Sequence, residues 1–162
     1  MRILIVEDEL SKKENILKSI YGKFNNLTVS EASSVRSAKQ ILKSKQEFDC
    51  IILDMSLPTF DIKKDEFGGR PQGFGGKEII RQMIRERIVI PIVVVTAYEV
   101  FHAKNSFDDT IQDITLDELK DQLISYSNLI KIEVIKYDAL IDDWKNQLME
   151  FLEKIDENIN CR

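Results

Sequence analysis

Short runs of β-branched and apolar residues alternate along this chain with segments whose apolar residues recur at helical spacing. Such alternation is typical of consecutive strand–helix–strand units, and it predicts a parallel sheet in an α/β fold. Four of the runs are almost continuously hydrophobic, as strands buried on both faces are, whereas the second is more polar and is expected at a sheet edge. The expected strands are Ile3–Val6, Leu27–Ser30, Cys50–Leu53, Ile90–Val95 and Ile130–Ile135.

Helices are expected between these strands and after the last one. Ser11-Lys-Lys-Glu14 and Thr115-Leu-Asp-Glu118 both match the capping-box pattern, which predicts a helix N-terminus at each. The last helical stripe is the broadest, so we expect a helix that packs on the core and ends near Ile155. This stripe comprises Leu140, Ile141, Trp144, Leu148, Phe151, Leu152 and Ile155.

Length and composition exclude several classes of protein. The 162 residues suit one compact domain. No apolar run is long enough to span a bilayer, and the first strand turns acidic at Glu7 where a signal peptide would stay hydrophobic, so we expect a cytoplasmic protein without membrane contact. A formal charge of -5 and a pI near 5.0 argue against direct nucleic-acid binding. Cys50 and Cys161 lack metal or redox spacing and are expected to be reduced thiols.

Polar residues stand where four of the predicted strands end. Glu7-Asp8-Glu9 follows the first strand, Asp54 the third, Thr96 the fourth and Lys136 the fifth. In an open parallel sheet, ligands bind beyond the carboxyl ends of the strands, near the point where the winding direction reverses. These side chains, although distant in sequence, are therefore expected to meet at one edge of the sheet.

Carboxylates gathered at one place repel one another and resist desolvation, so they need a cation or a shared proton. A hard divalent ion with oxygen ligands fits, and Mg²⁺ (or Mn²⁺) binds a few carboxylates together with water and phosphate oxygens. A carboxylate beside such an ion can attack phosphorus to form an aspartyl phosphate. Thr96 can then hydrogen-bond a phosphoryl oxygen and Lys136 can neutralise its charge. Glu9 also fits an ordinary helix N-terminal residue, and Lys136 an ordinary solvated lysine.

Three segments, in this order, resemble the receiver domains of two-component signalling. Ile3-Leu-Ile-Val-Glu-Asp-Glu9 is similar to the first strand of that family with its acidic pair, Ile52-Leu-Asp-Met-Ser-Leu-Pro58 to its phosphoacceptor turn, and Val94-Val-Thr-Ala97 to its fourth strand. The resemblance extends from Met1 to about Ile155. It implies a doubly wound, flavodoxin-like (CheY-like) five-stranded sheet with strand order 2-1-3-4-5.

The resemblance also implies a function and a set of site residues. A response regulator without an output domain would accept a phosphoryl group in a Mg-dependent reaction, and it would be a signalling domain rather than an enzyme, catalysing only its own phosphotransfer and dephosphorylation. Its implied partners are a sensor histidine kinase or a phosphotransfer protein, and an unknown downstream protein reached by direct contact. The implied residues are the phosphoacceptor Asp54, the metal ligands Asp8, Asp54 and the Ser56 backbone carbonyl, Glu7 acting through water, the switch hydroxyl Thr96 and the phosphate-pairing Lys136.

The chain departs from the family pattern in several places. Glu133 stands where the family usually has a switch aromatic, and Tyr137 where it usually has proline. Insertions are expected at about 59–76 and 100–114, and residues 156–162 would form a C-terminal tail. His102, in the second insertion, is expected to be a loop residue and not a phosphocarrier.

The first insertion is rich in glycine, at positions 68, 69, 73, 75 and 76. It starts just after the phosphoacceptor turn, so it either covers the site or is a tolerated surface loop. In the first case Arg70, Phe74 and Lys77 would supply two cations and an aromatic ring to a phosphate or a partner surface.

Two other functions remain open. A pseudo-receiver would bind a partner protein without phosphorylation, which Glu133, Tyr137 and the insertions would permit. A metal-dependent phosphohydrolase of the haloacid-dehalogenase-like family also forms an aspartyl phosphate, but it would have an aspartate at the position of Ser56.

Overall fold

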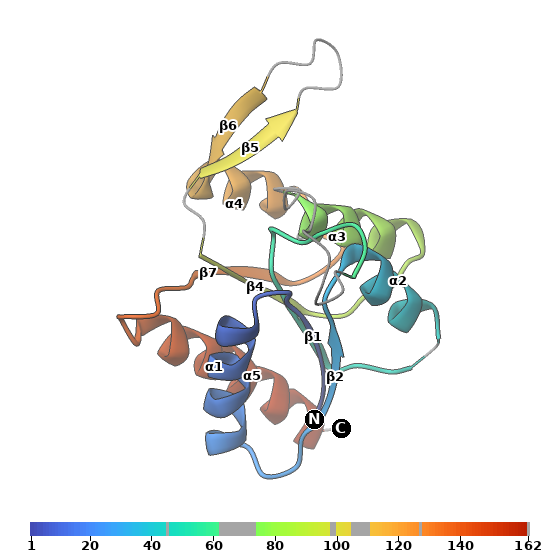
Figure 1. Cartoon of the computed structure of the whole chain (residues 1–162). Helices are drawn as coiled ribbons and strands as arrows, with labels where there is room; N and C mark the ends of the chain where they lie inside the picture. The colour runs from blue at the N-terminus through green and yellow to red at the C-terminus, as the bar shows by residue number, and fades with distance from the viewer. Residues whose placement is uncertain (45, 62–73, 98–99, 105–110, 127, 162) are drawn as a thin grey trace.

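The computed structural model describes residues 1–44, 46–61, 74–97, 100–104, 111–126 and 128–161. Five parallel strands form one sheet in the order β2-β1-β3-β4-β7 (Figure 1). The doubly wound order inferred from the sequence is thereby confirmed, with the more polar second strand at an edge. The strands are β1 (Arg2–Val6), β2 (Thr28–Ala32), β3 (Cys50–Leu53), β4 (Ile92–Thr96) and β7 (Ile132–Lys136).

Helices cover both faces of this sheet (Figure 1). Ile3 and Ile5 of β1 pack in one apolar cluster with residues of α1 and α5, whereas Leu4 and Val6 pack in another with residues of α2, α3 and α4. Alternate residues of a strand point to opposite faces, so a continuous apolar run supplies both layers. The helices are α1 (Leu10–Lys23), α2 (Val35–Lys43), α3 (Gly75–Arg85), α4 (Leu116–Ile124) and α5 (Asp143–Asn160). None of the described helices combines the length and apolar character that a bilayer span requires.

The expected second insertion forms an antiparallel hairpin of β5 (Val100–Lys104) and β6 (Ile111–Thr115), which projects beyond the main sheet (Figure 1). His102 therefore lies in a strand, and its assignment to a loop was wrong. Of the first insertion, residues 62–73, including Arg70, lie outside the described part of the chain.

Two helix starts differ in how well the sequence predicted them. Thr115 caps α4 together with Glu118, as the capping-box pattern predicted. The capping box at Ser11 was wrong, because α1 already begins at Leu10 after Glu9 and Ser11 lies inside the helix. The Ser11 hydroxyl donates a hydrogen bond to the Glu9 carboxylate at 2.6 Å, so it does not cap the helix.

The last helix was predicted correctly in its packing face but not at its ends. Leu140 is 94% exposed and precedes α5, since its backbone N–H donates to Asp138 Oδ1 and the chain makes a turn there. Its neighbour Ile141 is also exposed and precedes α5, so the predicted stripe was wrong at these two positions. The helix continues past Ile155 to Asn160, because Ile159 extends the apolar face onto the core.

Gly75 and Gly76 were expected in the glycine-rich insertion, but the structure places them in the first turn of α3, where both are buried. A Cβ atom on Gly76 would overlap the carbonyl oxygen of Asp54, and the Gly76 backbone N–H donates to the Met55 carbonyl at 3.1 Å. Glycine at this position therefore lets α3 approach the turn that carries Asp54.

Gly76→Ala is expected to lower the free energy of unfolding by about 1–3 kcal/mol, because the methyl group must displace backbone atoms of the turn. The matched control is Gly22→Ala in α1, where a Cβ meets nothing within 4 Å. That variant should gain about 0.5–1 kcal/mol from helix propensity. Urea denaturation of wild type, Gly76→Ala and Gly22→Ala measures both changes in stability. A Gly76→Ala protein as stable as wild type would contradict the close packing.

Candidate functional site

Three carboxylates gather where β1 and β3 end. Glu7 and Asp8 follow β1 and Asp54 follows β3, and these strands are neighbours in register, with Val6 opposite Leu53. One oxygen from each carboxylate lies within 4.8 Å of the other two. Glu7 and Asp54 are buried, whereas Asp8 is exposed. This arrangement could hold a cation between two buried oxygens and a third that faces solvent.

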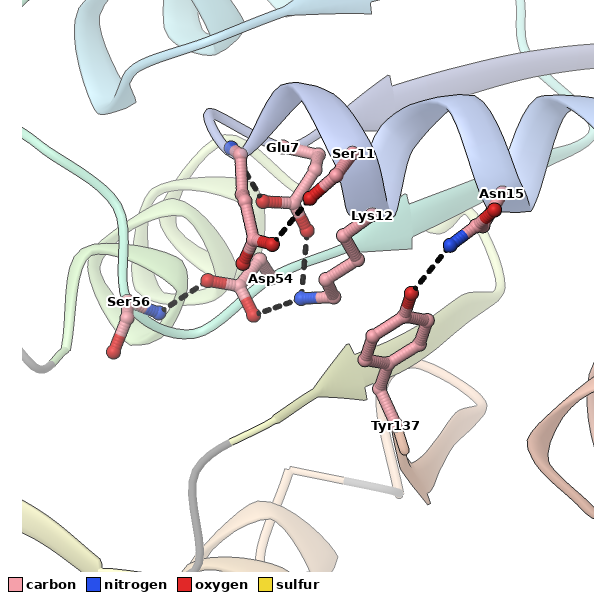
Figure 2. Close-up of polar contacts among 8 residues, drawn as sticks. Glu7, Ser11, Lys12, Asn15, Asp54, Ser56 and Tyr137 are labelled. Atoms are coloured by element: carbon pink, nitrogen blue, oxygen red, sulfur yellow. Dashed lines mark hydrogen bonds and ion pairs between the residues drawn. The ribbon is translucent and has the colours of Figure 1, made fainter. Parts of the chain in front are cut away.

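A buried lysine, which the sequence reasoning missed, lies against two of these carboxylates. Lys12 comes from the first turns of α1, and its side chain is only 2% exposed. The Lys12 Nζ atom lies 2.7 Å from Asp54 Oδ1 and 2.6 Å from Glu7 Oε2 (Figure 2). Lys12, which precedes the buried Ile16 by one helical turn, thus contacts the candidate phosphoacceptor directly.

Tyr137 forms one wall of the Lys12 site, at the position where the resembling family usually has proline. Lys12 Nζ lies 5.7 Å from the centre of the Tyr137 ring, within the range of a cation–π contact. A hydrogen bond from Asn15 Nδ2 to the Tyr137 hydroxyl at 2.8 Å holds the ring (Figure 2). Trp144 also contacts it, with ring centres 4.9 Å apart. The Tyr137 backbone N–H also donates to the Thr96 carbonyl at 2.8 Å.

Both oxygens of the Asp54 carboxylate have a donor. Oδ1 accepts from Lys12, and Oδ2 accepts from the backbone N–H of Ser56 at 2.8 Å. These contacts fix the orientation of the carboxylate at the end of β3. Ser56 is itself buried and lies in the turn that α3 packs against.

Burial and mutual repulsion dominate the electrostatics of this cluster. Burial raises the pKa of Glu7 to about 7, against the opposing effect of Lys12, and the charge of Asp54 adds to the increase. Desolvation, and then the charge of Asp54, also raise the pKa of Asp8. Burial alone would lower the pKa of Lys12, but Asp54 and Glu7 raise it above its ordinary value, so the ammonium stays charged. The Lys12 ammonium thus pairs with two of the three clustered carboxylates, Glu7 and Asp54.

The donor set suits a hard divalent cation. All three side chains offer carboxylate oxygens, the ligands that Mg²⁺ and Mn²⁺ prefer. Apart from its ion pair with Lys12, the buried Glu7 Oε2 has no hydrogen-bond partner among the described residues. That oxygen retains a lone pair for a metal ion or for a water bound to one.

Thr96 and Lys136 also lie at this edge of the sheet. Thr96 ends β4, is fully buried, and is opposite Lys136 in the register with β7. Lys136 is exposed. On the same strand, Glu133 is paired in register with Val93 and lies 3.4 Å from Lys131 in an ion pair. Glu133, which stands where the resembling family usually has an aromatic residue, is thus held in an ion pair.

No family model matches this chain. The chain is similar to the Detocs response regulatory protein DtcB of Enterobacter cloacae (strain JD6301), with 29% identity over 152 residues that cover 93% of this chain and 97% of DtcB. It is also similar in structure to the CheY-like response regulator receiver domain protein from Methanospirillum hungatei JF-1. The TM-score is 0.59 at 16% identity, over 99% of this chain and 98% of that one.

The chain has the fold of a response-regulator receiver domain. The same receiver fold is found in the response regulator TrrA of Thermotoga maritima, whose structure is a complex with Mg²⁺-BeF. That match has a TM-score of 0.58 at 19% identity and covers 95% of this chain and 97% of TrrA. In this receiver fold, the carboxylate cluster lies at the carboxyl ends of β1 and β3, on either side of the point where the winding direction reverses.

Proposed function

We propose that this chain is a phosphorylatable receiver, which accepts a phosphoryl group on Asp54 in a Mg-dependent reaction and signals through protein–protein contact. The observation that carries the proposal is the convergence of three carboxylates in a receiver fold: one oxygen each of Glu7, Asp8 and Asp54 lies within 4.8 Å of the other two. The structure of TrrA, which shares the fold, is a complex with Mg²⁺-BeF and supports the proposal that this chain also binds a divalent ion.

In the proposed reaction, an Asp54 carboxylate oxygen attacks the phosphorus atom of the donor. A new O–P bond forms while the bond from phosphorus to the leaving group breaks, and the leaving group departs with that electron pair. When bound, a divalent ion would shield the charge of the carboxylates and the phosphoryl oxygens. Asp8, Asp54 and the Ser56 carbonyl are the proposed ligands, with Glu7 acting through water.

The proposal extends to the residues that would read the phosphoryl group. The Thr96 hydroxyl would donate to a phosphoryl oxygen and Lys136 would pair with its charge, since both belong to strands that end at this edge. The phosphoryl group would come from a sensor histidine kinase or a phosphotransfer protein. The signal would then pass to a downstream protein by direct contact.

Acetyl phosphate tests this function without the natural partner. Incubation with Mg²⁺ is expected to add one phosphoryl group, seen as a single increment in intact mass, because the donor supplies phosphorus and acetate leaves. The same incubation with a chelator in place of Mg²⁺ should give no increment. Uptake that is equal with and without Mg²⁺ would contradict the metal-dependent mechanism.

The second candidate is a pseudo-receiver that binds a partner without phosphorylation. It is favoured by the ion pair of Lys12 with Asp54, which neutralises the nucleophile in the absence of any metal. Glu133 and Tyr137 also favour a pseudo-receiver, because they stand where the family usually has a switch aromatic and a proline. A protein that binds Mg²⁺ but is never labelled by acetyl phosphate would support this candidate over the first.

A further inference from the structure

We propose that Lys12 is an internal counter-ion that competes with the divalent cation for Glu7 and Asp54, and that it thereby sets the metal affinity of the site. This inference rests on the metal site of the proposed function, and it adds a residue that the family resemblance did not supply. Its basis is the position of one ammonium group among the carboxylates (Figure 2).

Lys12 uses the same oxygens that a metal would need. Its Nζ atom is 2.7 Å from Asp54 Oδ1 and 2.6 Å from Glu7 Oε2, so it bridges the two buried carboxylates. The other Asp54 oxygen is already occupied by the Ser56 N–H. A cation that binds Oδ1 must share it with the ammonium or displace it, and one that uses the remaining lone pair of Oδ2 is still repelled by the ammonium on the same carboxylate.

The surroundings leave the ammonium little room to withdraw. Lys12 is almost completely buried, and the Tyr137 ring lies beside its Nζ atom. That ring is itself held between Asn15 and Trp144. Movement of Lys12 away from the carboxylates therefore requires displacement of a packed side chain, which adds to the cost of metal binding.

Lys12 also stabilises the metal-free form of the protein. Lys12 gives Glu7 and Asp54 a partner inside the protein, and a buried carboxylate without a partner is costly. If Lys12 is replaced by an uncharged residue, the same oxygens lose this cation until a metal binds. The metal-free form then loses stability while the metal-bound form loses a repulsion, so both effects favour metal binding.

The test is a Mn²⁺ titration followed by the electron paramagnetic resonance of free Mn²⁺. Lys12→Met keeps the length and apolar stem of the side chain and removes its charge, and it should bind Mn²⁺ at least about ten-fold more tightly than wild type. Lys12→Gln, which retains polarity but not the charge, should also bind Mn²⁺ more tightly than wild type. The control is Lys13→Met, because Lys13 pairs with Glu31 at 2.8 Å, away from the cluster, and should bind like wild type.

Affinity that is unchanged or weaker in both Lys12 variants would overturn the inference, as would an absence of Mn²⁺ binding in all proteins. Binding that is detectable only in the Lys12 variants would support it. If these variants fold poorly without metal, the rise in melting temperature on adding Mn²⁺ is measured instead. A larger rise than in wild type supports the competition, and an equal rise contradicts it.

The same proteins separate this inference from the proposed function. Tighter Mn²⁺ binding by Lys12→Met, without any labelling by acetyl phosphate, would leave the counter-ion role intact and refute phosphorylation. Normal Mg-dependent labelling together with an unchanged Mn²⁺ affinity in the Lys12 variants would support phosphorylation and refute the counter-ion role.

Discussion

Asp54→Asn is expected to abolish phosphoryl uptake from acetyl phosphate in the presence of Mg²⁺. The amide keeps the shape of the carboxylate, and its single oxygen can still accept one of the two bonds that Asp54 accepts from Ser56 and Lys12, but it is not a nucleophile toward phosphorus. The substitution also removes one of the clustered negative charges, so the fold should survive. The expected result is therefore a folded protein without any mass increment.

Ser56→Ala is the matched control for this experiment. The hydrogen bond to Asp54 comes from the Ser56 backbone, so alanine retains it along with the backbone carbonyl proposed as a metal ligand. Labelling of this variant should continue. An Asp54→Asn protein that still gains one phosphoryl group would show that another residue is the acceptor.

Asp8→Asn is expected to weaken Mg²⁺ binding at least about ten-fold, since loss of a direct ligand should cost no less than loss of a residue that only orients one. Asp8 is the solvent-facing member of the carboxylate cluster, and the amide replaces a negative charge with a weaker neutral ligand. Calorimetric titration with Mg²⁺ gives the two dissociation constants directly.

Glu9→Gln provides the comparison, because Glu9 is adjacent in sequence but its carboxylate accepts a hydrogen bond from Ser11 and lies outside the cluster. It should bind Mg²⁺ nearly as wild type does. Equal affinities in wild type and Asp8→Asn would remove Asp8 from the metal site.

The parallel sheet and its edge strand followed from the sequence because the determining pattern is local, whereas the order 2-1-3-4-5 came from the family resemblance. Continuous apolar runs such as Cys50–Leu53 can be buried only inside a sheet covered on both faces, and the polar second run suits an edge. Helix starts were harder, because serine forms alternative local hydrogen bonds. Ser11 bonds to Glu9 instead of capping a helix, whereas Thr115 does cap one. The hairpin of β5 and β6 was predicted only as an insertion.

The carboxylate cluster was predictable because neighbouring parallel strands end together, which brings Glu7 and Asp54 side by side. Lys12 was not predicted, although its spacing from Ile16 and Ile20 places it on the buried face of α1. Spacing alone does not separate a buried lysine from one whose stem lies on apolar surface and whose ammonium reaches water. The deciding fact is its partner Asp54, 42 residues away in sequence, which only the fold brings close.

The most direct test of the central claim is to locate the phosphoryl group. Wild-type protein is labelled with acetyl phosphate and Mg²⁺, digested, and mapped by tandem mass spectrometry under conditions that preserve acyl phosphates. We expect one modified position, Asp54, in the turn that follows β3. A phosphoryl group mapped to any other residue would contradict this expectation.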